Sequence, residues 1–346
     1  MLLKKWYLNY YFLIKEVFKM RVRKTIVFLL ILTLLFSLSS IAFAQTTFRL
    51  AHIYDPSHAW SRGAEMAARL VEERTGGEVK IEVYPTSQLG TEEQILEGAI
   101  FGSIDIVISG AGQIGNLFKP INVLEMPYTF KNNDHVLKFA KSEIAQQMFA
   151  DFGKEFSLKV LAAMPYGTRQ LTSNKPIYTP ADLKGFKLRV AEQNVSLAYA
   201  RAMGADPTPI AFQEVYMALQ QGVVDGQENP LPTIQAMKFY EVQDYINLTS
   251  HVINCGTFLM NGDKFSGLSE ENQKIMLDAF SEAAEFITAD INESEKKLGA
   301  FFEEQGCTLV ESDIDAFIEA TKDMPTKFAK WWIRYGVDLH SRIHNL

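Results

Sequence analysis

Two arginines combine a residue type and a position that suit the binding of a small organic anion. Beyond residue 44 the chain has nine arginines, and two of them, Arg169 and Arg189, occur in strand-like segments. In Phe186-Lys187-Leu188-Arg189-Val190 the alternation places Arg189 opposite three apolar side chains, near the carboxyl end of the strand. Ligands of open α/β sheets bind at that end, and a guanidinium pairs with a carboxylate through two parallel hydrogen bonds. The alternative is a solvated arginine at a sheet edge.

Asn229 is a second candidate for contact with an anion. In Gln227-Glu228-Asn229-Pro230 the Asn-Pro pair predicts a helix start, with Asn229 as N-cap and Pro230 as the first helical residue. The amide of an N-cap residue can also face an anion that the positive end of the helix dipole attracts. Both roles are compatible with each other.

His52 and His58 flank the first expected strand-to-loop junction, close to Tyr54 and Trp60. A histidine pair suggests a metal, but no H-E-x-x-H pattern or other ligand set accompanies it. We therefore predict no metal site, and interpret the pair either as side chains of a ligand pocket or as structural residues. Serine-hydrolase and Cys-His patterns are also absent from the sequence, so we expect no catalytic residues.

The segment from Gly110 to Gly115 reads G-x-G-x-x-G directly after an expected strand, as in dinucleotide-binding folds. In those folds a helix of two or three turns follows the glycines, whereas Pro120 comes five residues after Gly115 here. We therefore expect a flexible loop at this strand end and no nucleotide or other cofactor.

The N-terminus predicts an export signal that is not part of the fold. After Met20, three basic residues precede the apolar run 26–36, and Ala42-Phe43-Ala44 predicts cleavage before Gln45. The apolar run is short for a bilayer span. Residues 1–19 do not resemble the start of a signal peptide, so we expect translation to begin at Met20. Without a cysteine at the cleavage site, the expected product is a freely soluble periplasmic protein rather than a lipid-anchored or membrane-anchored one.

Charge excludes nucleic acid and anionic lipid as partners. Residues 1–44 hold seven of the 34 basic residues and one of the 41 acidic ones, which leaves 27 against 40 and a formal charge of −13 on the remaining 302 residues. A chain of this length suggests two lobes. Cys255 and Cys307 are the only cysteines; they allow one disulfide, are too few for a zinc site, and their redox state is left open.

Strands that alternate with helices predict an α/β fold. Thr91-Glu92-Glu93-Gln94 is a capping-box pattern that starts one of the helices. The expected strands are 48–54, 79–84, 104–108, 159–163 and 186–190, and the expected helices begin near Ser57 and Thr91 and cover 194–203 and 212–221. The rhythm occurs twice, which predicts two α/β lobes with mostly parallel sheets.

A capped run from Ser269 to Gln305 with almost no glycine or proline predicts one long helix. Since it exceeds the diameter of a small lobe, it should lie across both lobes. A short strand and a helix with Trp331-Trp332, interpreted as core residues, are expected to close the chain.

Four motifs together resemble the solute receptors of tripartite ATP-independent periplasmic (TRAP) transporters. They are Tyr-Gly-Thr-Arg-Gln-Leu-Thr-Ser-Asn (166–174), Asp-Leu-Lys-Gly-Phe-Lys-Leu-Arg-Val (182–190), Gly-Ala-Asp-Pro-Thr-Pro-Ile-Ala-Phe-Gln-Glu-Val-Tyr (204–216) and Ala-Leu-Gln-Gln-Gly-Val-Val-Asp-Gly-Gln-Glu-Asn-Pro (218–230). The resemblance implies a two-lobed periplasmic binding protein fold of class II type, joined by crossing strands and one long helix. It places lobe I at 45–166 plus 255–294 and lobe II at 167–254 plus 295–346.

The resemblance also implies residue roles. Arg189 would make the main salt bridge to a ligand carboxylate, Arg169 and Asn229 would contact the same group, and Phe212 would pack on the ligand. The implied partners are a small organic acid and the membrane permease subunits of a TRAP transporter, and we expect a monomer.

Four departures from the sialic acid receptors of this family affect the expected ligand. Thr91 and Glu192 replace an Asp and an Asn that grip the sugar, the segment Ser109-Gly110 lacks a Glu, and Gly256 replaces a Gln. We therefore expect a smaller hydroxylated acid such as a uronate or an aldonate, with a C4-dicarboxylate or sialic acid as alternatives. Thr91, Glu192, His52 and His58 complete the expected ligand-binding set.

Two further classes of function remain open from the residues alone. One is an exported enzyme acting on sugar acids, with Glu192, Glu228 or His52 as general base. The other is a sensor subunit that presents its closed form to a receptor kinase.

Overall fold

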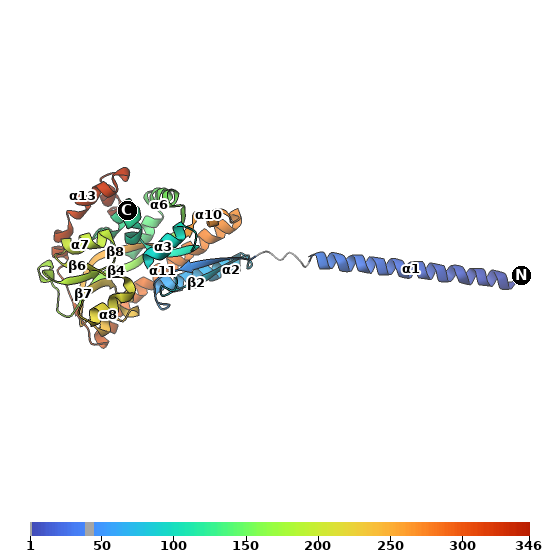
Figure 1. The fold of residues 1–346 in the computed structure, drawn as a ribbon, viewed down its shortest axis with the longest axis horizontal. Helices are drawn as coiled ribbons and strands as arrows, with labels where there is room; N and C mark the ends of the chain where they lie inside the picture. The colour runs from blue at the N-terminus through green and yellow to red at the C-terminus, as the bar shows by residue number, and fades with distance from the viewer. Residues whose placement is uncertain (1, 39–44) are drawn as a thin grey trace. The chain divides into compact units, whose positions relative to one another are not determined.

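The computed structural model describes residues 2–38 and 45–346, which divide into two compact units on either side of the boundary between Gln45 and Thr46 (Figure 1). The first unit contains the helix α1 (Leu2–Leu38). No helix in the described ranges has both the length and the apolar character needed to cross a membrane. The expected cleavage site Ala42-Phe43-Ala44 lies outside the described residues, so the signal peptide stays a prediction.

Nine strands form one sheet within Thr46–Leu346, in the order β2-β1-β3-β8-β4-β7-β5-β6, with β9 paired to β8. Their bounds are β1 (Thr46–Ala51), β2 (Val79–Tyr84), β3 (Ile106–Gly110), β4 (Leu158–Ser173), β5 (Lys187–Val190), β6 (Asp206–Pro209), β7 (Gly226–Pro230), β8 (Tyr245–Asn261) and β9 (Thr308–Val310). β1 is parallel to β2 and β3, and β5 is parallel to β6 and β7. The sheet therefore has two parallel halves, which lie on opposite sides of the unit Thr46–Leu346 in Figure 1.

Two long antiparallel strands join these halves. β4 has 16 residues and β8 has 17, and they pair with each other from Leu158 to Ser173 with three register irregularities. One end of the pair adjoins β3 and the other adjoins β7. The strand expected at 159–163 is thus only the first part of a strand that crosses the molecule. This arrangement confirms the two-part α/β architecture with crossing strands, although all of Thr46–Leu346 forms one compact unit and the exact lobe boundaries stay a prediction.

Helices connect the strands, and α2, α3 and α4 begin after the carboxyl ends of β1, β2 and β3. Their bounds are α2 (Ala59–Arg74), α3 (Glu92–Ile100), α4 (Ala111–Leu117), α5 (Asn133–Ala140), α6 (Glu143–Phe156), α7 (Asn194–Ala202), α8 (Val215–Gln220), α9 (Leu231–Ala236), α10 (Gly262–Ser266), α11 (Glu270–Glu304), α12 (Ile314–Thr321), α13 (Met324–Phe328) and α14 (Leu339–His344), with 3-10 helices η1 (Lys119–Glu125), η2 (Pro180–Leu183), η3 (Phe212–Glu214), η4 (Phe239–Glu241), η5 (Ala329–Trp331) and η6 (Ile333–Tyr335).

The long helix is confirmed. α11 begins after Ser269, whose side chain caps it by accepting a hydrogen bond from the N–H of Asn272, and continues for 35 residues. It packs against α2 and α5 toward one half of the sheet, against β4 in the middle, and against α9 and β9 toward the other half. Ten of its residues are buried, among them Phe280 and Phe302. One apolar helix face therefore stabilises both halves.

Three local predictions are wrong. The segment from Gly110 to Gly115 is not a flexible loop: helix α4 starts at Ala111 and ends at Leu117, before Pro120. Two helical turns fit in this space because Gly112 and Gly115 have no side chains. A side chain at Gly112 would overlap with Gln193, and one at Gly115 would overlap with Asn122. The glycines therefore allow close packing.

Asn229 is not a helix cap, since it lies in β7 and the N-cap of α9 is Pro230. Its pairing with β4 keeps the backbone extended here, so tertiary contacts override the Asn-Pro signal. The Trp331-Trp332 segment consists of two 3-10 turns rather than a helix, and only Trp332 is fully buried. Cys255 and Cys307 are both buried as free thiols.

Gly256 in β8 has a packing role that leads to a stability prediction. Trp60 lies directly over Gly256, where a methyl group would overlap with its ring, and its Nε1 donates a hydrogen bond to the carbonyl oxygen of Pro165 (2.8 Å). We expect Gly256→Ala to lower the free energy of unfolding by about 1–3 kcal/mol, measured by urea denaturation, because the core is overpacked. Gly267→Ala is the control, since Gly267 has room for a methyl group and a negative φ. Equal stability of the two variants would contradict this role of Trp60.

Candidate functional site

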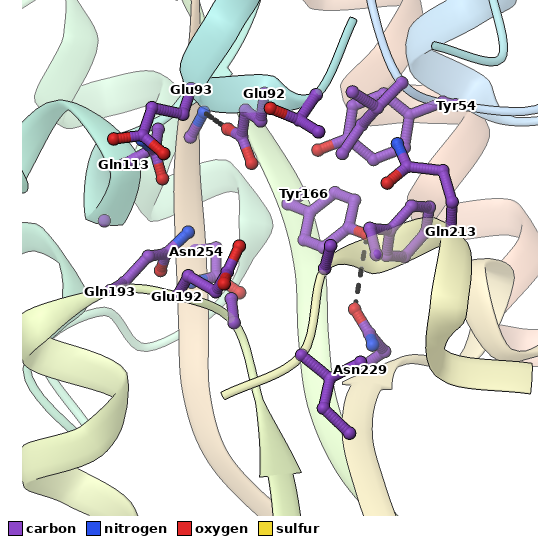
Figure 2. Close-up of a pocket in the computed structure, with 18 of the residues that line it drawn as sticks. Tyr54, Glu92, Glu93, Gln113, Tyr166, Glu192, Gln193, Gln213, Asn229 and Asn254 are labelled. Carbon is purple, nitrogen blue, oxygen red and sulfur yellow. Dashed lines mark hydrogen bonds between the residues drawn. The ribbon is translucent and has the colours of Figure 1, made fainter. Parts of the chain in front are cut away.

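A cavity lies between the two halves of the sheet, at the carboxyl ends of β1, β3, β5, β6 and β7 (Figure 2). It is lined by Ile53, Tyr54, Trp60, Thr91, Glu92, Glu93, Gly110, Gly112, Gln113, Glu125, Tyr166, Arg169, Arg189, Ala191, Glu192, Gln193, Ile210, Ala211, Phe212, Gln213, Asn229 and Asn254. Its volume is about 80 Å³. That size suits a small, polar solute at the position where α/β sheets bind ligands.

Arg189 lines this cavity and is only 2% exposed. Its Nε and Nη2 donate hydrogen bonds to the carbonyl oxygen of Ile210 (2.9 and 2.6 Å), which fixes the guanidinium. Its Nη1 has no partner, and no carboxylate lies within salt-bridge distance, among the residues that the structure describes. Burial lowers the pKa of Arg189 to about 10, so the side chain still carries its charge at neutral pH. A buried cation without a counter-ion is costly, and a bound anion would remove that cost.

Arg169 also lines the cavity, but its charge is already neutralised by Glu228. Its Nη2 donates to Glu228 Oε1 (2.7 Å), its Nε donates to Glu228 Oε2, and its Nη1 donates to Asn254 Oδ1 (3.0 Å). The expected contact between Arg169 and a ligand carboxylate stays a prediction. Arg169 can add at most a side contact, because most of its donors are engaged.

Glu228 is the centre of this buried polar network. It is fully buried, and besides Arg169 it contacts the hydroxyl of Tyr199 (3.0 Å) and Nε2 of His251 (3.2 Å). Burial by itself would raise the pKa of Glu228, but Arg169 and His251 outweigh burial and hold that pKa well below its ordinary value. Glu228 is not part of the cavity wall. Its position therefore does not support the alternative role of a general base.

Asn229 and Phe212 both lie in the cavity wall, as the family resemblance implies. Asn229 accepts a hydrogen bond from the hydroxyl of Tyr166 (3.3 Å) and donates one to Gln227 Oε1 (2.6 Å), so its amide is held in a fixed orientation (Figure 2). The ring of Phe212 lies 5.8 Å from that of Tyr54. Tyr54, Tyr166 and Phe212 thus form an aromatic side of the cavity.

Of the remaining expected site residues, Thr91 and Glu192 line the cavity, whereas His52 and His58 do not. Thr91 is also the N-cap of α3, in the expected capping box. His52 accepts a hydrogen bond from the N–H of Tyr54 (3.2 Å), and His58 caps α2 by accepting one from the N–H of Trp60 (3.1 Å). Burial lowers the pKa of His52 to about 4 and that of His58 to about 3, so both are neutral. Both histidine rings pack against Tyr54, and His58 also packs against Tyr166, so they contact the aromatic residues of the wall without lining the cavity themselves.

Three further acidic residues reach the cavity without having been singled out as site residues from the sequence: Glu92, Glu93 and Glu125. Glu92 accepts hydrogen bonds from the N–H of Gly110 (2.8 Å) and the hydroxyl of Ser109 (3.3 Å), and burial raises its pKa. Acidic residues are common in the first turn of a helix that starts with a capping box, so the sequence pattern gave no sign that Glu92 and Glu93 also line the cavity. Figure 2 shows both on the side of the cavity opposite Asn229.

Comparison with known proteins identifies the family. Residues 50–330 match the family described as bacterial extracellular solute-binding protein, family 7, and the chain belongs to this family. It is 33% identical over 305 residues to the sialic acid-binding periplasmic protein SiaP of Vibrio cholerae, a match that covers 88% of this chain and 95% of that protein.

Two solved structures of TRAP periplasmic solute-binding proteins are similar to this one. The protein of Roseobacter denitrificans with bound L-galactonate has 35% identity and a TM-score of 0.77, over 80% of this chain and 92% of that chain. The protein of Chromohalobacter salexigens with bound D-glucuronate has 29% identity and a TM-score of 0.82, over 86% and 99%. These likenesses confirm the two-lobed periplasmic binding fold that the motifs imply.

The Arg169–Glu228 pair leads to a prediction about stability and its pH dependence. We expect Glu228→Gln to lower the free energy of unfolding at pH 7 by about 3–5 kcal/mol, because it leaves a buried guanidinium without its counter-ion. The folded-state pKa of Glu228 is depressed, so its stabilisation is present above the ordinary carboxyl pKa and is lost as the pH falls toward the folded-state value. The difference in the free energy of unfolding between wild type and Glu228→Gln should therefore become smaller at acidic pH.

Urea denaturation at pH 7 and pH 3 measures both effects. Glu282→Gln is the control, because Glu282 forms an exposed ion pair with Arg74 and its loss should change stability little. A Glu228→Gln protein as stable as wild type at pH 7 would contradict the ion-pair role.

Proposed function

We propose that this chain is an exported receptor that binds a sugar acid, such as a uronate or an aldonate, and delivers it to the membrane subunits of a TRAP transporter without changing it chemically. The observation that carries the proposal is the charged, buried Arg189, which faces a small cavity and has no carboxylate partner in the described part of the chain. Family membership and the acids in the titles of the similar structures support it. Periplasmic location follows from the same role.

The charges around the cavity favour an acid with a single carboxylate. Arg189 is the one cation of the described cavity wall without a carboxylate partner, while Glu92, Glu93 and Glu192 lie in the rest of the wall. Carboxylates are acceptors, so they suit the hydroxyl groups of a sugar chain. A second carboxylate on the ligand would meet like charge, which disfavours C4-dicarboxylates.

The size of the cavity favours a six-carbon acid over sialic acid. A cavity of about 80 Å³ leaves less room for a nine-carbon sugar than for a uronate or an aldonate. The indole of Trp60 occupies the space above Gly256, where the sialic acid receptors carry a glutamine according to the sequence resemblance. Relatives in this family bind other acids by name, among them sialic acid and C4-dicarboxylates, so the cavity wall and not the fold decides the ligand.

Binding would proceed by closure of the two halves around the ligand. The ligand carboxylate meets Arg189 on the β5 side, and the α3 side then closes over the hydroxyl groups, which shifts an equilibrium between open and closed forms. The membrane subunits would recognise the closed form. Because β4 and β8 are continuous through both halves, they are suited to act as the hinge.

A thermal-shift screen tests the ligand class. We expect D-glucuronate or L-galactonate to raise Tm clearly, since a ligand at a hundred times its Kd adds about 2.7 kcal/mol of stability. Succinate and sialic acid should give little or no shift. Mass spectrometry of the incubated acid should show no product. A strong shift with succinate alone, or conversion of the acid, would contradict the proposal.

Substitution of Arg189 tests the anchor. We expect Arg189→Ala to weaken binding of the sugar acid by about 2–5 kcal/mol, or thirty- to several-thousand-fold, in isothermal titration calorimetry. Arg189→Lys should also bind poorly, because a point charge cannot reproduce the guanidinium geometry. Arg201→Ala, an exposed arginine on α7, serves as the matched control and should bind like wild type. Equal affinity of Arg189→Ala and wild type would remove Arg189 from the site.

A further inference from the structure

One acidic residue in the cavity wall has no role in the account above. Glu125, the last residue of η1, is only 2% exposed and lines the cavity. Its Oε2 accepts a hydrogen bond from the side-chain amide of Asn254, while its Oε1 is buried without any hydrogen-bond partner among the described residues. An ionised carboxylate offers about four acceptor positions, whereas Glu125 interacts with only two donors, the side-chain amide of Asn254 and the backbone N–H of Cys255.

No lysine, arginine or histidine of the described residues forms a salt bridge with Glu125. The guanidinium of Arg169 is connected to Glu125 through Asn254 but is already paired with the carboxylate of Glu228. A second carboxylate on this network would be repelled by Glu228 and would have lost its water. The packing therefore favours the neutral acid, in which Oε1 carries a proton and becomes a donor.

We propose that Glu125 holds its proton in the ligand-free protein and uses it to donate a hydrogen bond from Oε1 to an oxygen of the bound acid. The second part of this inference rests on the proposed function, because it needs an acid in the cavity. A buried donor without a partner is costly, so a ligand oxygen at this place gains both the bond and the removal of that cost. Glu125 would then act beside Arg189 as a neutral donor.

The pKa of Glu125 agrees with the geometry. Burial raises it to about 8, and the positive charge of Arg169 opposes this increase only in part. The other groups that face Glu125 do not titrate in the same range: Glu228 has a depressed pKa, and burial raises the pKa values of Tyr199 and of the Cys255 thiol far above neutral. Burial also raises the pKa of Glu92 in the same cavity wall, so the contribution of Glu125 is the part of the pH dependence that Glu125→Gln removes.

The first experiment needs no ligand and compares Tm of wild type with Glu125→Gln, which keeps the shape and cannot ionise. A carboxyl whose folded-state pKa is raised contributes stability that is present below its ordinary pKa and lost as the pH rises through the raised value. The Tm of Glu125→Gln relative to wild type should therefore increase from pH 5 to about pH 8 and then level off. Glu97→Gln, on the exposed side of α3, should show a constant difference. A constant difference for Glu125→Gln as well would overturn the inference.

The second experiment measures binding of D-glucuronate, and separately of L-galactonate, by calorimetry between pH 7 and pH 9, where Arg189 stays charged. Wild-type and Glu97→Gln affinities should fall about tenfold over this interval, because only the protonated form of Glu125 donates. The affinity of Glu125→Gln should change much less over this pH interval than that of wild type. The same pH dependence in wild type and Glu125→Gln, or an affinity that rises with pH, would overturn the donor role.

The two experiments separate this inference from the proposed function. If wild type binds neither acid at any pH, the proposed function is contradicted and the donor role is overturned with it. The ligand-free experiment would still show whether Glu125 holds a proton.

Discussion

The organisation of the site depends on one constraint: two guanidinium groups are buried near each other, and only one of them is paired with a carboxylate in the described ranges. Arg169 and Arg189 are both buried, and Glu228 is bound to Arg169. Arg189 is left with a backbone carbonyl as its protein partner, which orients it but cannot neutralise it. The positive charge of Arg189 is therefore buried without a counter-ion from the described residues, which is unfavourable. An anion that binds from solution would supply the missing counter-ion.

The fold provides what this constraint requires. The crossing strands β4 and β8 bring Arg169 and Asn254 into contact, although they are 85 residues apart in the chain. The parallel halves place the carboxyl ends of their strands at the same cavity, and glycines at Gly112 and Gly256 let neighbouring side chains approach the backbone. A helix as long as α11 supports both halves with one apolar face. Because β4 and β8 run through both halves, they are suited to act as a hinge between them.

The cavity wall explains how one family can bind different acids. The arginine, asparagine and aromatic residues on the β5 and β7 side suit any carboxylate, while the residues of α3 and η1 on the other side meet the rest of the ligand. In this chain that second side is acidic and narrowed by Trp60. Under the proposed function, selectivity would come from hydrogen-bond acceptors, cavity size and the protonation of carboxyl groups, which are local properties of the wall and not of the shared fold.

The sequence alone determined the α/β class, the long capped helix, the capping box at Thr91 and the family, because periodicity, caps and contiguous motifs are local signals. Strand alternation made Arg189 a candidate but left a solvated arginine at a sheet edge open, and burial in the cavity wall decides between the two. Only the tertiary structure decided that Asn229 belongs to a strand, that His52 and His58 stand behind the cavity, and that Glu92 and Glu125 reach it. Which carboxylate neutralises which arginine depends on contacts between distant strands, and burial sets the resulting charges, so no local pattern in the chain could reveal them.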